Sequence, residues 1–323
     1  MSASRNRTAF GAQLHRKHAI RTAVILVLFF MIAGSGGIVF AGWKNRQAAG
    51  RRELLELWER GSYREAFDAS AEKLAGNPMD FLFLTIHGFS AFQLAVAQIN
   101  AHDTELYADE CVRSLRKALL CREGPGDFRI HYVLGKAYYY KGSGYEDLAV
   151  RYLEEARDGG YRSADMNELL GLAYAAIHDY RGSVAAFSEA LSTEADAASA
   201  GVVGDATPSD LLLLNIARSY LALEETAQAR AYLLRLLETS RDAAVKTNAR
   251  LFLGEIASAA GDITAAETWY TAILAEDGEN AEAHFRLGEL YARGGNATRA
   301  RAEWRRALWI DPAHRQARTR LNL

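Results

Sequence analysis

One spacing of small and large residues recurs along this chain and constrains the fold more than any other feature of the sequence. Each clear copy has a Gly, a Tyr three residues later, a small residue after twelve, a large one after sixteen and an Ala after nineteen. The best copies are Gly288, Tyr291, Ala300, Trp304 and Ala307, and Gly171, Tyr174, Ser183, Phe187 and Ala190. Because apolar residues three and four apart line one face of a helix, each copy predicts two amphipathic helices joined by a turn.

Other copies keep the same phase over most of the chain. The positions equivalent to the Gly are 54, 88, 135, 171, 217, 254 and 288, which defines seven units. They are 34 to 37 residues apart except after 88 and 171, where the gaps are 47 and 46 residues. We expect inserted loops at about 95–105 and 192–209 in these two gaps. Only four Pro among 323 residues also favours helices over strands broken by turns.

The pattern resembles the tetratricopeptide repeat (TPR), a helix-turn-helix of about 34 residues with Leu-Gly, Tyr, Ala, a large aromatic residue and Pro at set positions. Residues 50–314 carry the resemblance. It implies an all-α fold, a right-handed TPR-like α-solenoid of about seven helix-turn-helix units whose neighbours bury one another's apolar faces. It also implies a scaffold for protein recognition. Residues 313–323, with a short apolar stripe, are expected to form a C-terminal capping helix.

Each residue type in the pattern has a packing role. We expect the glycines to lie where the two helices of a unit cross closely, because a side chain there would push the helices apart. These are Gly88, Gly135, Gly171, Gly254 and Gly288. Large side chains are expected to fill the space between one pair of helices and the next. These are Tyr138, Tyr174, Tyr220, Tyr291, Phe187 and Trp304.

A basic tail and an uncharged apolar segment precede the repeats. Residues 1–21 hold five basic side chains and no acid, and the 22 residues Thr22–Trp43 hold no charge. As a helix this segment would span about 33 Å, against about 30 Å for the hydrocarbon core of a bilayer. We interpret 22–43 as a single transmembrane helix with Trp43 at the interface. A cleaved signal peptide ending near Val39–Ala41 is the alternative.

The residues around this segment also predict its orientation. The acid-free N-terminal flank favours an N-terminus inside the cell and repeats outside the cytoplasm. The expected location is the inner (cytoplasmic) membrane of a bacterium, with the TPR domain in the periplasm; signal cleavage would instead release the protein to the periplasm. Ala33, Gly37 and Ala41 share one helix face and would let two membrane helices approach closely. They predict a homodimer, unless they reflect only the abundance of small residues in such helices.

In TPR proteins the first helix of each unit lines a concave groove, into which residues beside the Leu-Gly and Tyr positions point. The resemblance therefore assigns a partner-binding role to aromatic and basic residues at those places. These are Arg129, Tyr132, Lys136, Tyr139 and Tyr140 in the third unit, and Phe89 and Phe92 in the second. They suit a peptide with apolar anchors and some acid. Packing against neighbouring helices is the alternative. The Lys, Asn and Arg clamp with which some relatives grip a C-terminal carboxylate is absent.

We find no spacing typical of catalysis, metal binding or phosphate binding, so no enzyme, cofactor or metal is expected. Eight Arg lie between Arg293 and Arg320, against two acids. This end could dock an acidic partner, lipid headgroups or nucleic acid, although the solvated face of a terminal helix is the commoner explanation. Nucleic acid is not expected, because no aromatic residues are interleaved with these arginines.

The leading hypothesis is a membrane-anchored TPR scaffold or adaptor that binds a protein partner through its concave groove. The alternative is a permanent structural or assembly subunit of a bacterial envelope complex. An enzyme or a carbohydrate-binding protein is a minor alternative, because the residue patterns of both are missing.

Overall fold

The structure, a computed structural model, describes residues 49–98, 100–121, 127–142, 144–199 and 209–322. The predicted basic tail at 1–21, the predicted transmembrane helix at 22–43 and its predicted dimer face of Ala33, Gly37 and Ala41 lie outside these residues. Within the described part of the chain, no helix is both long and apolar enough to span a bilayer. These residues form helices joined by turns, without a strand, so the all-α prediction is confirmed.

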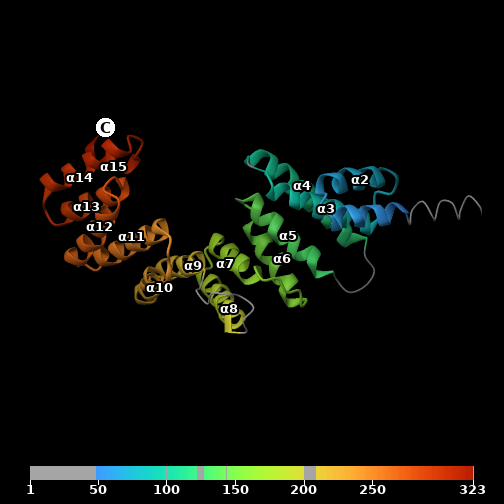
Figure 1. Cartoon of the computed structure of the whole chain (residues 1–323), viewed down its shortest axis with the longest axis horizontal. Helices are drawn as coiled ribbons and strands as arrows, with labels where there is room; N and C mark the ends of the chain where they lie inside the picture. The colour runs from blue at the N-terminus through green and yellow to red at the C-terminus, as the bar shows by residue number, and fades with distance from the viewer. Residues whose placement is uncertain (1–48, 99, 122–126, 143, 200–208, 323) are drawn as a thin grey trace, which may run out of the picture. The chain divides into compact units, whose positions relative to one another are not determined.

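The chain divides into two compact units, Met1–Gly124 and Pro125–Leu323, here called the N-terminal unit and the C-terminal unit. Residues 49–59 of the N-terminal unit are helical. They are followed by α2 (Tyr63–Gly76), α3 (Phe81–Val96) and α4 (Ala101–Leu120). α3 packs against both α2 and α4, so this unit is a stack of antiparallel neighbours (Figure 1).

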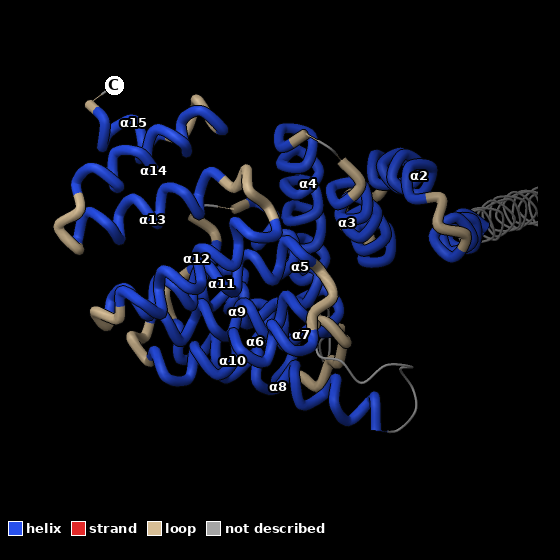
Figure 2. Tube along the Cα trace, turned by 60° about the vertical axis from the view of Figure 1, so that its left-hand side comes forward, coloured by secondary structure: helices blue, strands red, loops and turns tan. Residues whose placement is uncertain are grey.

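The described residues of the C-terminal unit continue the same pattern with ten longer helices and a short last one. They are α5 (Phe128–Lys141), α6 (Glu146–Asp158), α7 (Met166–Ala176), α8 (Tyr180–Ser199), α9 (Asp210–Ala222), α10 (Thr226–Thr239), α11 (Ala243–Ala259), α12 (Ile263–Glu276), α13 (Ala281–Arg293), α14 (Ala297–Ile310) and α15 (Arg315–Leu321). Every helix packs against the next one in the chain, so the hairpins stack side by side (Figures 1 and 2). The described chain is thus a TPR-like solenoid, while its right-handed winding stays a prediction.

The glycines of the repeat lie against large side chains of the second helix in the same hairpin. A Cβ built on Gly171 of α7 would lie 2.5 Å from Cδ1 of Phe187 on α8. That separation is far inside van der Waals contact, so the two backbones can approach only because Gly has no side chain. The corresponding pairs are Gly88 with Leu115, Gly135 with Leu153, Gly254 with Tyr270 and Gly288 with Trp304.

The first hairpin reverses this distribution of sizes. Leu54 stands where five of the other hairpins have Gly and one has Ala217. Sixteen residues later, Ser70 stands where Phe187 and Trp304 occur. Both Leu54 and Ser70 are completely buried. The large residue that fills the crossing therefore comes from the first helix rather than the second, which conserves the packed volume.

Two tyrosines of the repeat join neighbouring hairpins, and two others pack within their own hairpin. Tyr174 of α7 donates a hydrogen bond of 2.5 Å to Glu154 of α6, and Tyr291 of α13 donates one of 2.6 Å to Glu267 of α12. Burial, and then the bond to the carboxylate, raises the pKa of each phenol to about 12. Two other repeat tyrosines pack by ring stacking, with interplanar angles of 12° for Tyr138 on Tyr152 and 21° for Tyr220 on Tyr232.

The two long gaps in the repeat contain more helix than the spacing predicted. α4 begins at Ala101 and α8 continues to Ser199, so residues 101–105 and 192–199 are helical. The prediction that these residues form loops is wrong. Asn100 begins α4 early, because its side chain accepts a hydrogen bond from the backbone N–H of Asp103. The extension of α8 is rich in Ala, the residue with the highest helix propensity.

α15 ends the C-terminal unit. Its one buried residue, Ala317, joins an apolar cluster with Phe285 of α13 and with Trp304 and Ala307 of α14. The opposite side of α15 exposes Arg315, among other polar residues. The helix therefore covers the apolar face of the last hairpin and presents a polar surface to solvent, as a solenoid end requires.

Candidate functional site

The structure separates the predicted groove residues of α5 into exposed and buried ones. Arg129 is exposed and forms a two-bond ion pair with Asp127, the residue that begins its helix. Tyr140 exposes 43% of its surface, and Tyr139 is half-buried beside it, with ring centroids 6.1 Å apart. Arg129 and Tyr140 therefore have exposed surface available for contact with a partner. Tyr139, like Lys136, is half-buried.

Tyr132 and Lys136 of α5 instead contact the residues before α7. Tyr132 is buried, and its hydroxyl donates a hydrogen bond of 2.5 Å to Asp165. The Lys136 ammonium lies 2.9 Å from the same carboxylate, which also accepts a bond from Ser163. Burial alone would raise the pKa of Asp165, but the bonds from Ser163, Tyr132 and Lys136 outweigh it and lower that pKa. These residues hold α5 against the next hairpin, which revises the prediction that Tyr132 lines an open groove.

Phe89 and Phe92 lie on α3 in the N-terminal unit, whereas the α5 residues belong to the C-terminal unit. Phe92 is only 5% exposed, so its ring belongs to the core. Phe89 is half-buried and packs against Trp58, with ring centroids 5.9 Å apart. The alternative of packing against neighbouring helices therefore describes Phe92, and Phe89 retains part of its surface.

A Ser, a His and a Glu of the N-terminal unit lie in a row that resembles a hydrolase triad. Ser70 Oγ is 2.9 Å from Nδ1 of His87, and Nε2 of His87 is 3.3 Å from Glu110. However, Ser70 is completely buried and its hydroxyl also donates to the carbonyl of Phe67. Because no substrate can reach Ser70, the row joins helices rather than performing nucleophilic catalysis. No group of acids, His or Cys in the described residues is arranged to hold a metal ion.

One opening on the C-terminal unit is a cavity of about 610 Å³, here called the α13 pocket. Its walls come from the first helices α11 and α13 and from the capping helix α15, with Tyr270 of α12 behind them. The lining residues are Glu255, Ser258, Ala259, Tyr270, Phe285, Arg286, Glu289, Arg293, Arg315, Gln316, Thr319 and Arg320. The volume is in the range of ordinary ligand sites, so the pocket can receive a short peptide segment.

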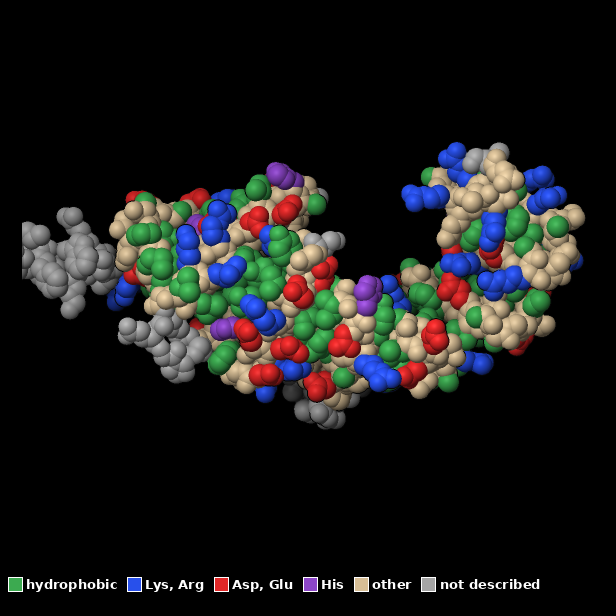
Figure 3. Space-filling model, turned by 180° about the vertical axis from the view of Figure 1, so that it is seen from behind, with side chains coloured by type: hydrophobic (Ala, Val, Ile, Leu, Met, Phe, Trp, Pro, Cys, Tyr) green, Lys and Arg blue, Asp and Glu red, His purple; other side chains and the backbone are tan. Residues whose placement is uncertain are grey.

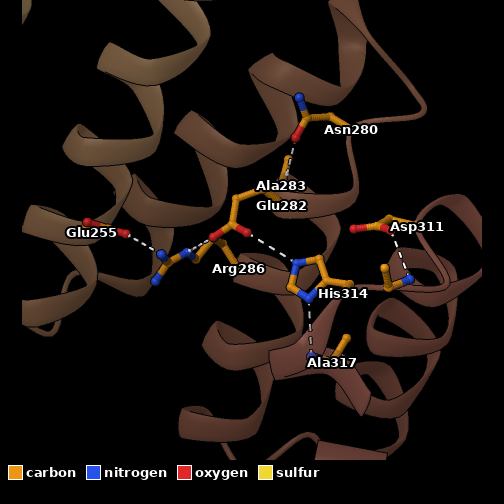
Figure 4. A network of polar contacts seen from close by, with 9 residues as sticks. Glu255, Asn280, Glu282, Ala283, Arg286, Asp311, His314 and Ala317 are labelled. Atoms are coloured by element: carbon orange, nitrogen blue, oxygen red, sulfur yellow. Dashed lines mark hydrogen bonds and ion pairs between the residues drawn. The ribbon is translucent and has the colours of Figure 1, made fainter. Parts of the chain in front are cut away.

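A chain of polar contacts holds the three walls of the α13 pocket together (Figure 4). Arg286 of α13 donates to Glu255 of α11 at 2.7 Å and to Glu282 of its own helix at 2.6 Å. Nε2 of His314 lies 3.2 Å from Glu282, and Nδ1 accepts the backbone N–H of Ala317 in α15. Since Nδ1 accepts that bond, the neutral ring carries its proton on Nε2 and donates it to Glu282. The network thus fixes α15 against α13.

Four arginines line the α13 pocket, and their partners differ. Arg286 belongs to the network above, and Arg320 forms a two-bond pair with Glu289 at 2.8 and 2.6 Å. Arg293 donates only to the hydroxyl of Ser258, at 2.9 Å. Among the described residues, no carboxylate forms an ion pair with Arg293 or Arg315. Figure 3 shows basic side chains gathered over the C-terminal helices.

The offsets from the repeat Gly that predict groove residues in the third unit also identify residues of this pocket. Phe285 and Arg293 stand at the same offsets from Gly288 as Tyr132 and Tyr140 do from Gly135. The rule that selects groove residues of the third unit therefore selects pocket residues in the seventh. The rule cannot identify the residues that α15 contributes to the pocket, because this helix lies outside any repeat. They are Arg315, Gln316 and Arg320.

A stack of helical hairpins, in which each helix packs on its sequence neighbours, defines the class of helical-repeat solenoids. Two family models described as tetratricopeptide repeat match residues 214–280 and 257–321. These residues therefore carry tetratricopeptide repeats, and the predicted resemblance is confirmed for them. Proteins with this repeat are generally scaffolds for protein interactions.

One solved structure supports the fold over a longer part of the chain. The C-terminal part of a TPR repeat-containing protein from Cytophaga hutchinsonii matches with a TM-score of 0.57 and 15% identity, over 83% of this chain and 97% of that one. This likeness shows the fold alone. PilF of Pseudomonas aeruginosa matches with a TM-score of 0.45 and 16% identity, over 76% and 96% of the two chains. MamA of Desulfovibrio magneticus RS-1 matches with 0.46 and 16%, over 59% and 99%. No curated protein sequence matches the chain.

Proposed function

We propose that this protein is a membrane-anchored, non-catalytic scaffold that holds a protein partner on the face formed by its first helices. The observation that carries the proposal is the α13 pocket, an opening of about 610 Å³ lined mainly by α11, α13 and α15. A solenoid buries its apolar faces between neighbouring hairpins and leaves its first helices free for contact. The pocket adds aromatic and guanidinium groups, which are enriched where proteins bind one another.

The anchor in this proposal rests on the sequence. The uncharged segment Thr22–Trp43 is long enough to cross a bilayer, and basic residues flank it on both sides. It would place the repeats near the inner membrane, on the periplasmic side. Alkaline extraction of membranes and protease access in spheroplasts test this part. A protein released by alkali, or a domain protected from external protease, contradicts it.

Partner binding is tested by photo-crosslinking of the full-length protein in its own membranes. A benzoylphenylalanine in place of Gln316 lies in the α13 pocket, and one in place of Arg305 lies on the exposed surface of α14, outside the pocket. We expect a discrete protein adduct, identified by mass spectrometry, from position 316 and not from position 305. Equal adducts from both positions, or none from 316, contradict the proposed function.

A second function, a permanent subunit of an envelope assembly, is favoured by one surface residue. Trp309 of α14 exposes 65% of its surface, and the Arg306 guanidinium lies 4.3 Å from the centre of its ring. Trp and Arg are enriched among the residues that carry most of the binding energy at protein interfaces. If this function holds, Trp309→Ala should dissociate a native complex on blue-native electrophoresis, whereas a scaffold with a transient partner should migrate unchanged.

A further inference from the structure

The α13 pocket keeps an excess of positive charge once its internal ion pairs are formed. Glu255 is paired with Arg286 and Glu289 with Arg320, so both acids of the lining already have partners. Arg293 and Arg315 keep their positive charge without a carboxylate among the described residues. Both guanidiniums line the same cavity, one from α13 and one from the capping helix α15.

The wall behind these arginines carries a hydroxyl donor and an apolar ring. Tyr270 lines the cavity, and burial, with the Glu255 carboxylate, raises the pKa of its phenol to about 12. The hydroxyl therefore stays protonated at neutral pH, and the residue is 2% exposed, so Tyr270 forms the floor of the cavity. Phe285 is largely buried, with 5% of its surface exposed, and only that small remaining part of its ring can line the cavity. The pocket thus offers two free cations and a small aromatic surface.

We propose that the α13 pocket binds an acidic segment of the protein partner, with its carboxylates on Arg293 and Arg315 and an apolar neighbour against Phe285. This inference rests on the proposed function and specifies the chemistry of the partner. A guanidinium binds a carboxylate through two parallel N–H bonds, which gives direction as well as charge. Because the two arginines come from different helices, two acids a few residues apart fit better than one.

Polyanions suit the pocket less well than an acidic peptide. Glu255 and Glu289 stand in the same lining, and their pairing with Arg286 and Arg320 leaves only two cations free. A nucleic acid or an anionic lipid surface brings closely spaced phosphates and prefers a dense, acid-free cationic surface. Carboxylates separated by apolar side chains match both the sparse charge and the aromatic wall.

The experiment uses the purified full-length chain in non-ionic detergent and three fluorescein-labelled probes. One is a pool of decapeptides made of Asp, Glu, Leu, Phe, Ala and Gly; the second replaces the acids by Lys and Arg; the third is a single-stranded oligonucleotide. Fluorescence anisotropy at physiological salt measures binding. We expect the acidic pool to bind most tightly, and Arg293→Glu with Arg315→Glu to weaken it by about tenfold or more, a loss of at least ~1.4 kcal/mol.

The matched control reverses two arginines outside the pocket, Arg301→Glu with Arg305→Glu on α14, which changes the net charge equally. We expect its affinity for the acidic pool to stay within about twofold, because long-range attraction is screened at this salt. The milder pair Arg293→Gln and Arg315→Gln, checked by thermal melting, keeps the test valid if the Glu variant unfolds. Equal loss in both double variants, no loss in the pocket variant, or tighter binding of the basic pool or the oligonucleotide overturns the inference. Because crosslinking from Gln316 does not depend on these probes, the proposed scaffold function can survive that result.

Discussion

Gly288 of α13 lies against the indole of Trp304 so closely that a Cβ built on it would be 2.5 Å from Cδ1. The same Cβ would be 3.1 Å from the backbone oxygen of Ala300, which cannot rotate away. The two helices of the hairpin can cross at this distance only because one of them carries no side chain there.

We therefore expect Gly288→Ala to destabilise the C-terminal unit by about 1–3 kcal/mol, the usual cost of overpacking. Gly171→Ala should behave alike, because its Cβ would meet Phe187. Gly278→Ala is the control, since its nearest atom would be 3.6 Å away and its backbone is not left-handed. Urea unfolding followed by circular dichroism measures the shift. A midpoint for Gly288→Ala equal to that of Gly278→Ala would show that the crossing tolerates a methyl group.

Leu54 should be the most sensitive residue of the first hairpin, because it supplies the volume that a large residue of the second helix supplies in the other hairpins. Leu54 is fully buried among Leu57, Ala66 and Phe83. We expect Leu54→Ala to cost about 2–5 kcal/mol through lost burial and a residual cavity. Leu55→Ala is the adjacent control, since Leu55 is 41% exposed. Similar urea midpoints for the two variants would contradict the inference that Leu54 fills the space opposite the small Ser70.

Alkaline pH should destabilise the C-terminal unit in a defined window. The pKa values of Tyr174, Tyr270 and Tyr291 are raised to about 12 in the folded chain, against about 10 when unfolded. Raised values favour the protonated phenols in the folded state, so this stabilisation is complete below pH 10 and lost as pH rises towards 12. We expect thermal midpoints to fall in that window, and to fall less steeply in Tyr174→Phe with Tyr291→Phe. If the thermal midpoint of the double variant fell with pH as steeply as that of the wild type, the role assigned to Tyr174 and Tyr291 would be contradicted.

Acid should weaken the N-terminal unit through Glu110. The hydrogen bond from His87, helped by Arg113 and opposed by burial, lowers the pKa of this carboxyl below 4.5. A lowered pKa stabilises the folded state above the unfolded value, and this contribution disappears as pH falls through the folded value. We expect Glu110→Gln to unfold more readily at pH 7 and to lose less stability on acidification. Glu105→Gln, at an exposed position of the same helix, is the control. Parallel pH curves for wild type and Glu110→Gln would refute the prediction.

The capping helix should detach first when His314 is changed. The ring accepts the backbone N–H of Ala317 and contacts Glu282, so His314→Ala removes both the first capping bond of α15 and its tie to α13. Loss of such a cap costs about 0.5–2 kcal/mol. Hydrogen exchange should quicken at amides 317–321 and not in α11, while Gln316→Ala, in the same helix, should leave both rates unchanged. Unaltered exchange in α15 of His314→Ala would mean that packing of Ala317 alone holds the helix.

The sequence alone determined the elements that depend on local periodicity. The offsets of Gly171 and Gly288 predicted helical hairpins and their register, because small and large residues must alternate wherever two helices cross. They failed at 101–105 and 192–199, where helix propensity and a cap at Asn100 extended the second helices beyond the repeat. The offsets cannot say which side of a helix a neighbour will cover, because that depends on residues far away in the chain.

Only the tertiary structure decided which groove residues are free. Tyr132 is buried because Asp165, thirty-three residues later, accepts its hydroxyl, and Phe92 is buried in the core around α3. The α13 pocket needs α15, a segment outside the repeat, to bring Arg315 to the cavity that Arg293 lines. Periodicity reports the packing of each helix on its sequence neighbours, whereas a binding site forms where distant charges and surfaces converge.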